Sequence, residues 1–306
     1  MGMKILITGG SGFIGSRIAE SLQAKGHDVS VLDLNRPRVK GVSFTSGSVL
    51  EIDAVDKAVK DCDAVFHLAA MMGVWNTEQH PIATLDVNIL GTRNVLESCR
   101  KNGVKKILLT SSSEYYGEPV RTPLSEDDLP RPKSAYGVTK VACEYYVRSY
   151  GTEYGLDYSL VRYFNVYGPG QSDAFVLPKF VGLALEGKPL TVYGDGGQIR
   201  CFAHVQDVVE GTLLAFFSEA GSKQTFNIGN DSEPLTMSEA ATRVLKLVGS
   251  DAKPVFVPLE QTDRSSAREI YKRIPDISKA RKMLGYEPKV TLDEGIQTLI
   301  DYRKKR

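Results

Sequence analysis

A glycine-rich turn between an apolar run and a helical pattern constrains the fold of this chain more than any other feature. The run MKILIT suits a central strand, and FIGSRIAESLQAK, which follows the glycines, has apolar residues at helical spacing. Gly9 permits the tight turn, Gly12 lets a pyrophosphate approach the backbone, and Gly15 lets the helix pack on the strand. The positive end of the helix dipole then faces the phosphates. This order of strand, turn and helix predicts a dinucleotide-binding unit.

An acidic residue lies in the second predicted strand, DVSVLDL. Asp33 comes eighteen residues after Gly15, the distance at which a carboxylate meets the adenosine ribose hydroxyls. A carboxylate there repels a 2′-phosphate and favours NAD, whereas the nearby Arg36 and Arg38 would serve such a phosphate and favour NADP. Because the acid has the expected spacing, we expect NAD.

Strand-like and helix-like segments alternate through the first half of the chain. VSFT, AVFHLAA and KILLT read as strands, and helical patterns separate them. Such alternation predicts an α/β fold, namely a Rossmann-type doubly wound parallel sheet covered on both faces. We assign residues 1–165 to this NAD-binding domain, with its sheet completed by later segments. Because the alternation loosens afterwards, residues 166–306 are assigned mainly to a smaller, interleaved C-terminal lobe that binds substrate.

The strand AVFHLAA and the helix after it contain small and polar residues near the expected cofactor site. Ala69 and Ala70 end the strand and allow a cofactor to come close. Asn88 is either a buried amide that steadies the catalytic loop or an ordinary polar helix residue. His67 lies inside an apolar run, where a hydrogen-bonded core histidine is more common than a catalytic one.

The stretch from 110 to 140 contains the residues best suited to catalysis. Ser112, Ser113 and Glu114 follow KILLT and therefore lie at the C-terminal end of a buried strand, where α/β sheets bind ligands. Tyr136 and Lys140 are four residues apart on a predicted helix and project from one face. A cation held near a phenol favours the phenolate form, which makes Tyr136 a candidate base. Such a pair is also found on ordinary helix surfaces, so the interpretation depends on the upstream hydroxyls and the glycine turn.

Composition limits the other classes of function. The 306 residues have a formal charge of +1, which gives no general attraction to nucleic acid or an acidic membrane. The four cysteines are isolated, so we expect no metal site and no disulfide framework, and instead reduced thiols in a cytoplasmic protein. No apolar run approaches the roughly 18 residues that span a bilayer, and the first residues read as a strand instead of a signal peptide.

These motifs together resemble the extended short-chain dehydrogenase/reductase family, and within it the NAD-dependent nucleotide-sugar epimerases, dehydratases and decarboxylases, with UDP-glucose 4-epimerases as the nearest type. The resemblance covers nearly the whole length. It rests on TGGSGFIGS, Asp33, VFHLAA, NILGTRNVLE, SSSEYYG, SAYGVTK, RYFNVYGPG, LTVYGDGGQIRCFAHVQDVV and PDISKARKMLGYEP.

The resemblance implies a role for each matched residue. Tyr136 would be the base, Lys140 its partner and a ligand of the nicotinamide ribose, and Ser112 a hydroxyl that holds the sugar, with Ser113 and Glu114 as further catalytic candidates. A tightly bound, recycled NAD would be contacted by Gly9, Gly12, Phe13, Ile14, Gly15, Asp33, Asn35, Arg36, Ser48, Val49, Leu68, Ala69, Ala70, Asn88, Tyr136, Lys140 and Tyr163. The nucleotide sugar would be contacted by Met72, Lys179, Asn165 at the diphosphate, Tyr193 near the base, Arg200 at a phosphate and Arg268 as a second diphosphate ligand.

The implied reaction is oxidation at C4 of a hexose, for which Tyr136 takes the hydroxyl proton. The 4-keto sugar can then be reduced from its other face, lose the C6 hydroxyl, or lose carbon dioxide if C6 is a carboxylate. Dehydratases of the family have an Asp–Glu pair where this chain has Ser113 and Glu114, and a serine is too weak an acid for that role. Ser–Glu resembles the uronate decarboxylases, but the loop MMGVWNTEQH lacks their Ser/Pro-rich segment.

We therefore expect 4-epimerisation of a UDP-hexose, with UDP-glucuronate decarboxylation or dehydration through Glu114 as alternatives. An alternative of another class is a non-catalytic NAD-sensing protein, but such a protein has no need of Tyr136, Lys140 and Ser112 together. The resemblance also implies a homodimer that pairs through the predicted helices at 81–102 and 134–150. The partners expected are thus a nucleotide sugar and a second copy of the chain, with no nucleic acid and no membrane.

Overall fold

The computed structural model describes residues 2–262 and 269–305, and its main element is a seven-stranded sheet in which every neighbouring pair is parallel. The strand order is β11-β6-β5-β4-β1-β2-β3. This is the order of a doubly wound, Rossmann-type sheet, so the predicted fold class is confirmed. The strands are β1 (Lys4–Thr8), β2 (Asp28–Asp33), β3 (Ser43–Ser46), β4 (Ala64–His67), β5 (Lys106–Ser112), β6 (Asp157–Tyr163) and β11 (Gln224–Ile228).

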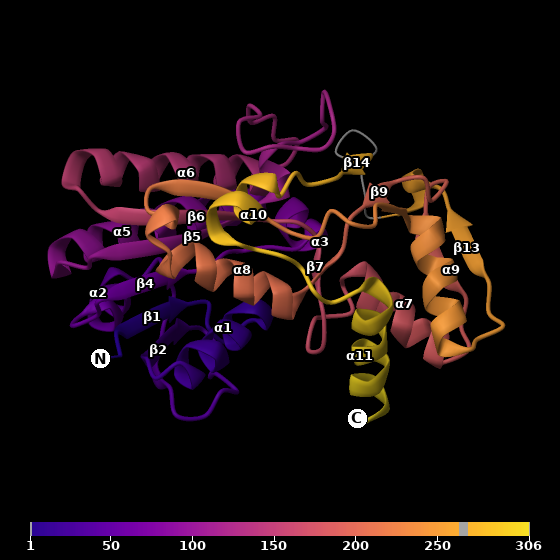
Figure 1. Ribbon diagram of the computed structural model, residues 1–306, viewed down its shortest axis with the longest axis horizontal. Coiled ribbons are helices and arrows are strands. Elements are labelled where there is room, and N and C mark those ends of the chain that lie inside the picture. The colour runs from indigo at the N-terminus through magenta and orange to yellow at the C-terminus, as the bar shows by residue number, and fades with distance from the viewer. Residues whose placement is uncertain (1, 263–268, 306) are drawn as a thin grey trace.

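Helices cover both faces of this sheet (Figure 1). One face packs on α2 (Ile52–Val59), α5 (Gly91–Asn102) and α6 (Ala135–Tyr154), and the other on α1 (Phe13–Ala24), α8 (Val205–Phe217) and α10 (Ser278–Leu284). Successive residues of a strand point to opposite faces: Leu6 packs in the first core, and Ile5 and Ile7 pack in the second. Because both faces are buried, the central strands read as continuous apolar runs.

A smaller lobe with its own apolar core lies beside the sheet, at the right of Figure 1. Its elements are α7 (Val176–Leu185), β8 (Leu190–Tyr193), α9 (Met237–Val248), β13 (Pro254–Val257) and α11 (Leu292–Lys304). A three-stranded sheet of β12 (Leu235–Thr236), β9 (Ile199–Arg200) and β14 (Lys272–Arg273) lies at the junction, as does the pair β7 (Val166–Tyr167) and β10 (Ala203–His204). Segments after residue 165 thus contribute to both parts, since α8, β11 and α10 complete the sheet layer.

The helix predicted over 81–102 is interrupted. It consists of α4 (Pro81–Leu85), a π-helical turn η1 (Asp86–Leu90) and α5. Single π turns are rare and occur frequently at functional sites. The remaining short elements are α3 (Val74–Gln79), η2 (Ser113–Tyr115), η3 (Glu219–Gly221) and η4 (Leu259–Gln261).

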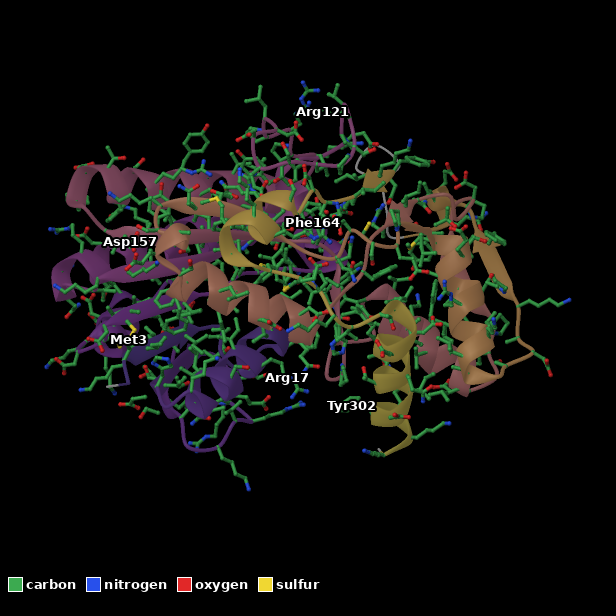
Figure 2. All side chains as sticks on the ribbon, in the orientation of Figure 1. Met3, Arg17, Arg121, Asp157, Phe164 and Tyr302 are labelled. Carbon is green, nitrogen blue, oxygen red and sulfur yellow. The ribbon has the colours of Figure 1, made fainter. Side chains whose placement is uncertain are left out.

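The end of β6 lies at the centre of the molecule, where Phe164 is fully buried (Figure 2). The segment that follows β14, residues 274–276, comes close to it there and is called the C-terminal segment. The long loop 117–133, whose outer part carries Arg121 in Figure 2, is tied to that segment by backbone bonds. The Leu124 N–H donates to the Ile274 carbonyl at 2.8 Å, and the Asp276 N–H donates to the Leu124 carbonyl at 2.7 Å. These bonds connect the loop after β5 to the strand β14 of the junction. Within residues 2–262 and 269–305, each helix is too short or too polar to span a lipid bilayer.

His67 is a core histidine, as its sequence context suggested. Its Nδ1 is 2.7 Å from the Thr8 hydroxyl and its Nε2 is 3.0 Å from the Thr92 hydroxyl. Burial, reinforced by the Lys140 cation, lowers the pKa of His67 from 6.5 to about 3. The imidazole therefore stays neutral in the folded protein at every pH at which the protein would be assayed.

We predict that His67 makes the fold sensitive to acid. Below pH 6.5 the unfolded chain protonates this histidine and the folded chain does not, so its contribution to the free energy of unfolding falls by about 1.4 kcal/mol per pH unit down to about pH 3. Urea unfolding between pH 4.5 and 6.5 should show a slope that is steeper by about this amount in the wild type and in the exposed control His80→Gln than in His67→Gln. Equal slopes in the wild type and His67→Gln would contradict the prediction.

Candidate active site

Of the three key glycines in the turn after β1, Gly12 is the one at which an added Cβ would be least crowded. Gly9 has φ +73°, and a Cβ there would lie 2.7 Å from the Ala69 nitrogen. A Cβ on Gly15 would lie 2.3 Å from the Gly9 carbonyl oxygen, so both positions require glycine for the fold itself. A Cβ on Gly12 would meet only that same oxygen, at 3.2 Å. We call the surface in front of Gly12, at the N-terminus of α1, the cradle, because an added Cβ there would meet one backbone oxygen and no other atom within 4 Å.

Asp33 lies next to this turn, at the end of β2. Its Oδ2 accepts a hydrogen bond from the Ser11 N–H at 3.0 Å, and its Oδ1 accepts one from the Asn35 N–H at 2.9 Å. The Ser11 hydroxyl donates to the Asn35 carbonyl at 2.6 Å, which joins the turn to the β2–β3 loop. The Arg36 guanidinium lies over the Phe44 ring, 5.9 Å from its centroid. The carboxylate is thus held at the edge of the cradle.

The loops after β3 and β4 follow along the same edge of the sheet. Leu68 and Ala69 continue from β4, and the Ala69 N–H donates to the Thr8 hydroxyl at 3.2 Å. Ser48 and Val49 follow β3, and the Asn94 amide donates to the Val49 carbonyl at 3.0 Å.

Asn88, in the π turn, is a buried amide that holds the loop after β4. Its Oδ1 accepts from the Met71 N–H at 2.7 Å, and its Nδ2 donates to the Met71 carbonyl at 3.1 Å and to the Thr139 hydroxyl at 3.0 Å. The sequence left open whether Asn88 is a buried amide that steadies a loop or an ordinary polar helix residue. The structure shows the buried amide. Met72, the next residue of that loop, is half exposed.

Tyr136 and Lys140 lie one turn apart on α6 and face the end of β5. The Lys140 ammonium donates to the Thr110 carbonyl at 3.0 Å and lies 5.4 Å from the centroid of the Tyr136 ring. Lys140 is buried, whereas Tyr136 is half-buried. Ser134 caps the helix by accepting a hydrogen bond from the Gly137 N–H at 3.0 Å. The cation predicted beside the phenol is therefore in place.

The turn Ser112–Glu114 comes close to the start of α6. A Cβ on Gly137 would lie 2.9 Å from the Glu114 carbonyl oxygen, so the two backbones approach to a distance that only glycine allows. The Glu114 N–H donates to the Ser112 hydroxyl at 3.2 Å, and the Glu114 carboxylate accepts from the Ser134 hydroxyl at 3.3 Å. Ser113 is buried. The Ser112–Glu114 turn therefore lies against the first turn of α6, the turn that carries Tyr136.

Arg273, which was not predicted as a site residue, pairs with Glu114. The guanidinium of Arg273, on β14, forms an ion pair with the Glu114 carboxylate, and both side chains are mostly buried. Arg273 lies opposite Arg200 in the parallel pair β9–β14, and side chains at such positions share a face of the sheet. Sequence gave little signal for this contact, because 159 residues separate the partners.

The candidate substrate residues are spread over the junction and the lobe. Arg200 is buried, and its guanidinium pairs with the Glu269 carboxylate at 2.9 Å. The Lys179 ammonium lies over the Tyr193 ring, 5.3 Å from its centroid. Asn165 has φ +37° and donates from its amide to the Cys201 carbonyl at 3.1 Å. Arg268 lies outside the described residues.

Tyr163 ends β6, and its hydroxyl is 2.8 Å from the Thr212 hydroxyl of α8. Burial raises the pKa of this tyrosine, so it remains a neutral phenol. Its side chain thus packs beneath α8, on the face of the sheet opposite α6.

The residues fit a dinucleotide. The cradle at Gly12, the N-terminus of α1 and the Asp33 carboxylate supply a pyrophosphate site and a ribose site at one edge of the sheet. Lys140 and Tyr136 lie at the end of β5, two strands from β1 at that edge. The candidate base therefore lies at the same edge of the sheet as the dinucleotide site.

Comparisons with known proteins agree with this arrangement. Residues 5–229 match the model of the NAD dependent epimerase/dehydratase family. The chain is 36% identical to a UDP-N-acetyl-alpha-D-glucosaminuronate decarboxylase of Bacillus cytotoxicus, over 99% of this chain and 98% of the relative. Its fold matches a UDP-glucose 4-epimerase of Thermotoga maritima, solved with UDP-glucose, with a TM-score of 0.91, 35% identity and 99% of each chain covered. It also matches a UDP-glucuronic acid 4-epimerase from Bacillus cereus, solved with UDP-glucuronic acid and NAD, with a TM-score of 0.89, 32% identity and 99% of each chain covered.

We predict that Gly12→Ser separates cofactor binding from folding. Serine is a good N-cap residue and Gly12 caps α1, so the free energy of unfolding should change by less than about 1 kcal/mol. The added side chain fills the cradle, so the NAD released from denatured protein should fall about tenfold or more.

Gly15→Ser is the matched control, because its Cβ collides with backbone in the fold and should cost roughly 1–3 kcal/mol of stability. Full NAD content in Gly12→Ser would show that the cofactor does not occupy this space.

Proposed function

The chain belongs to the NAD-dependent epimerase/dehydratase family, and we propose that it is the member that epimerises a UDP-hexose at C4 through a transient 4-keto sugar. The observation that carries this proposal is the group formed by Lys140, Tyr136 and the Ser112 turn at the end of β5, along the edge of the sheet that carries the glycine turn. A protein that only binds NAD has no need of this group.

Tyr136 acts as the general base in this proposal. It accepts the proton of the C4 hydroxyl and later returns a proton to the C4 oxygen. Lys140, fixed by the Thr110 carbonyl, holds a positive charge beside the Tyr136 ring. The Ser112 hydroxyl donates to the C4 oxygen and keeps it within reach of Tyr136. NAD, when bound, supplies the two-electron acceptor that allows the C4 alcohol to become a ketone and then restores it.

The C-terminal lobe holds the nucleotide in this proposal. Arg200, Lys179 and Asn165 offer cationic and amide donors to a diphosphate, and Tyr193 offers a ring to the base. Arg200 is paired with Glu269, so a diphosphate would compete with a carboxylate for that guanidinium. UDP is proposed because the similar proteins named above are described with UDP-sugars.

A second candidate function rests on the ion pair between Glu114 and Arg273. C6 is two bonds from C4, so a guanidinium beside the Ser112 turn is placed to bind a carboxylate at C6. A 4-keto sugar with a C6 carboxylate is a β-keto acid and loses carbon dioxide. The 36% identical relative from Bacillus cytotoxicus, a decarboxylase by name, supports the same alternative.

The proposal includes a homodimer in the cytoplasm. Exposed apolar residues lie along the outer side of α4 to α6, namely Ile82, Leu90, Val138 and Tyr145. A second copy of the same helices would cover them. All four cysteines are free thiols, in agreement with a reducing compartment.

We predict that Tyr136→Phe lowers kcat by about 10²–10⁴-fold with little change in NAD content, because only the phenolic hydroxyl is lost. Proton NMR of UDP-glucose, UDP-N-acetylglucosamine and UDP-glucuronate incubated with the protein would identify an epimer, a keto-deoxy sugar or a pentose. Tyr154→Phe, at the far end of the same helix, should match the wild type. A wild type that binds NAD and converts none of the three sugars would favour the non-catalytic NAD sensor.

We predict that Arg273→Met distinguishes the two candidates. If the site takes a C6 carboxylate, loss of the charged hydrogen bonds should lower kcat/KM for UDP-glucuronate about 10–100-fold and leave UDP-glucose nearly unchanged. Arg243→Met, which removes two ion pairs of the lobe, is the control. Equal losses on both sugars would rule against carboxylate recognition by Arg273.

We predict that light scattering gives twice the 33.6 kDa mass of the chain. Tyr145→Glu places a charge on the apolar helix face and should yield the monomer. A monomeric wild type would exclude the dimer.

A further inference from the structure

A buried arginine lies between helix α6 and the turn after β5. Arg162, on β6, has 1% of its surface exposed. Its Nε and Nη2 donate to the two carboxylate oxygens of Glu144 at 2.8 and 2.7 Å, and its Nη1 donates to the Tyr116 hydroxyl at 2.8 Å and to the Glu126 carbonyl at 3.1 Å. None of these partners has been assigned a role in binding or chemistry. An arginine inside an apolar strand, as in DYSLVRYFN, is the sequence signal that such a network exists.

One side of this guanidinium fixes helix α6. Glu144 has no exposed surface and forms a bidentate pair with Arg162, a geometry that a planar guanidinium fits and an ammonium does not. Tyr136, Lys140 and Glu144 are spaced four residues apart, so they follow one face of α6. The contact between Glu144 and Arg162 therefore helps to fix the rotation of α6 about its axis and its position along that axis. The position of Tyr136 depends on both.

The other side of the guanidinium fixes the turn after β5. Its carbon lies 3.5 Å from the centroid of the Tyr115 ring and 4.9 Å from that of Tyr116. These two tyrosines directly follow Glu114, and the Tyr116 N–H donates to the Ser113 carbonyl at 3.2 Å. Burial raises the pKa of Tyr116, so its phenol keeps the proton that it donates to the Asn227 Oδ1 at 2.6 Å. The position of Ser112 and Glu114 is thus tied to Arg162 through the adjacent residues.

The same network reaches the segment that carries Arg273. The Asn227 amide donates to the Leu124 carbonyl at 2.9 Å and to the Asp276 carbonyl at 3.1 Å. Asp276 lies three residues after Arg273, the partner of Glu114. One cation therefore joins α6, the Ser112–Glu114 turn and the C-terminal segment.

We propose that Arg162 is a positioning residue that sets the separation between the Tyr136–Lys140 face of α6 and the Ser112–Glu114 turn; this inference rests on the proposed function for the chemistry that it supports. An unpaired buried charge costs free energy, so movements that break the hydrogen bonds of the Arg162 guanidinium are disfavoured. Its partners are therefore held in one arrangement. A misplacement of about 1 Å between reacting groups costs up to about 10²-fold in rate. The hydrogen-bond partners of Arg162 do not include Gly12 or Asp33. Replacing Arg162 should therefore lower kcat and leave NAD binding unchanged.

The test compares three variants of the full chain. Arg162→Lys keeps the charge and loses the bidentate geometry, and Tyr116→Phe removes only the hydroxyl that joins Arg162 to Asn227. Arg148→Lys is the control: Arg148 also bonds Glu144, at 2.9 Å, and is not hydrogen-bonded to the turn. We expect kcat to fall about 10–100-fold in Arg162→Lys and less in Tyr116→Phe, with KM and NAD content within about twofold and Arg148→Lys close to wild type.

Hydrogen exchange gives a readout that does not depend on turnover. Amides of residues 113–116 should exchange about tenfold faster or more in Arg162→Lys, and those of β1 and α1 should not change. If the wild type converts no sugar, the proposed function fails and the exchange data alone decide the inference. If Arg162→Lys does not fold, kcat and the exchange of residues 113–116 in Tyr116→Phe decide the inference. Unchanged exchange at 113–116, a parallel loss of kcat and NAD content, or an equal loss of kcat in Arg148→Lys would overturn the proposal.

Discussion

The close approach of the β5 turn to the start of α6 is the constraint on which the candidate site depends. Glu114 and Gly137 meet backbone to backbone, and a methyl group between them would be 2.9 Å from an oxygen. Because these two segments touch, the Ser112–Glu114 turn lies against the first turn of the helix that carries Tyr136. The parallel sheet makes this possible, since it brings the ends of β1, β4 and β5 to the same edge.

Two arginines on neighbouring strands make the C-terminal segment part of that edge. Arg200 and Arg273 occupy matched positions in β9 and β14, and each is held by a carboxylate, Glu269 and Glu114. Glu114 belongs to the turn after β5 in the sheet layer, and its partner Arg273 belongs to β14 at the junction. The charge arrangement of the site is therefore shared between segments from the middle and the end of the chain.

Features that depend on residues close together in the sequence were predictable from it. The glycine turn, Asp33 and the Tyr136–Lys140 pair are local patterns, and the fold class follows from the alternation of strands and helices. The π turn at Asp86–Leu90 was not predicted, because its residues read as ordinary helix, and the Arg273 contact depends on distant segments. Arg162 was detectable as a charge in an apolar run, although its partners were not.

The interleaving of the two parts of the molecule has an evolutionary consequence. Elements α8, β11 and α10 belong to the sheet layer, while α7, α9 and α11, which alternate with them along the chain, belong to the lobe. The coding sequence of neither part is contiguous. A single recombination event therefore cannot exchange the lobe as one contiguous cassette.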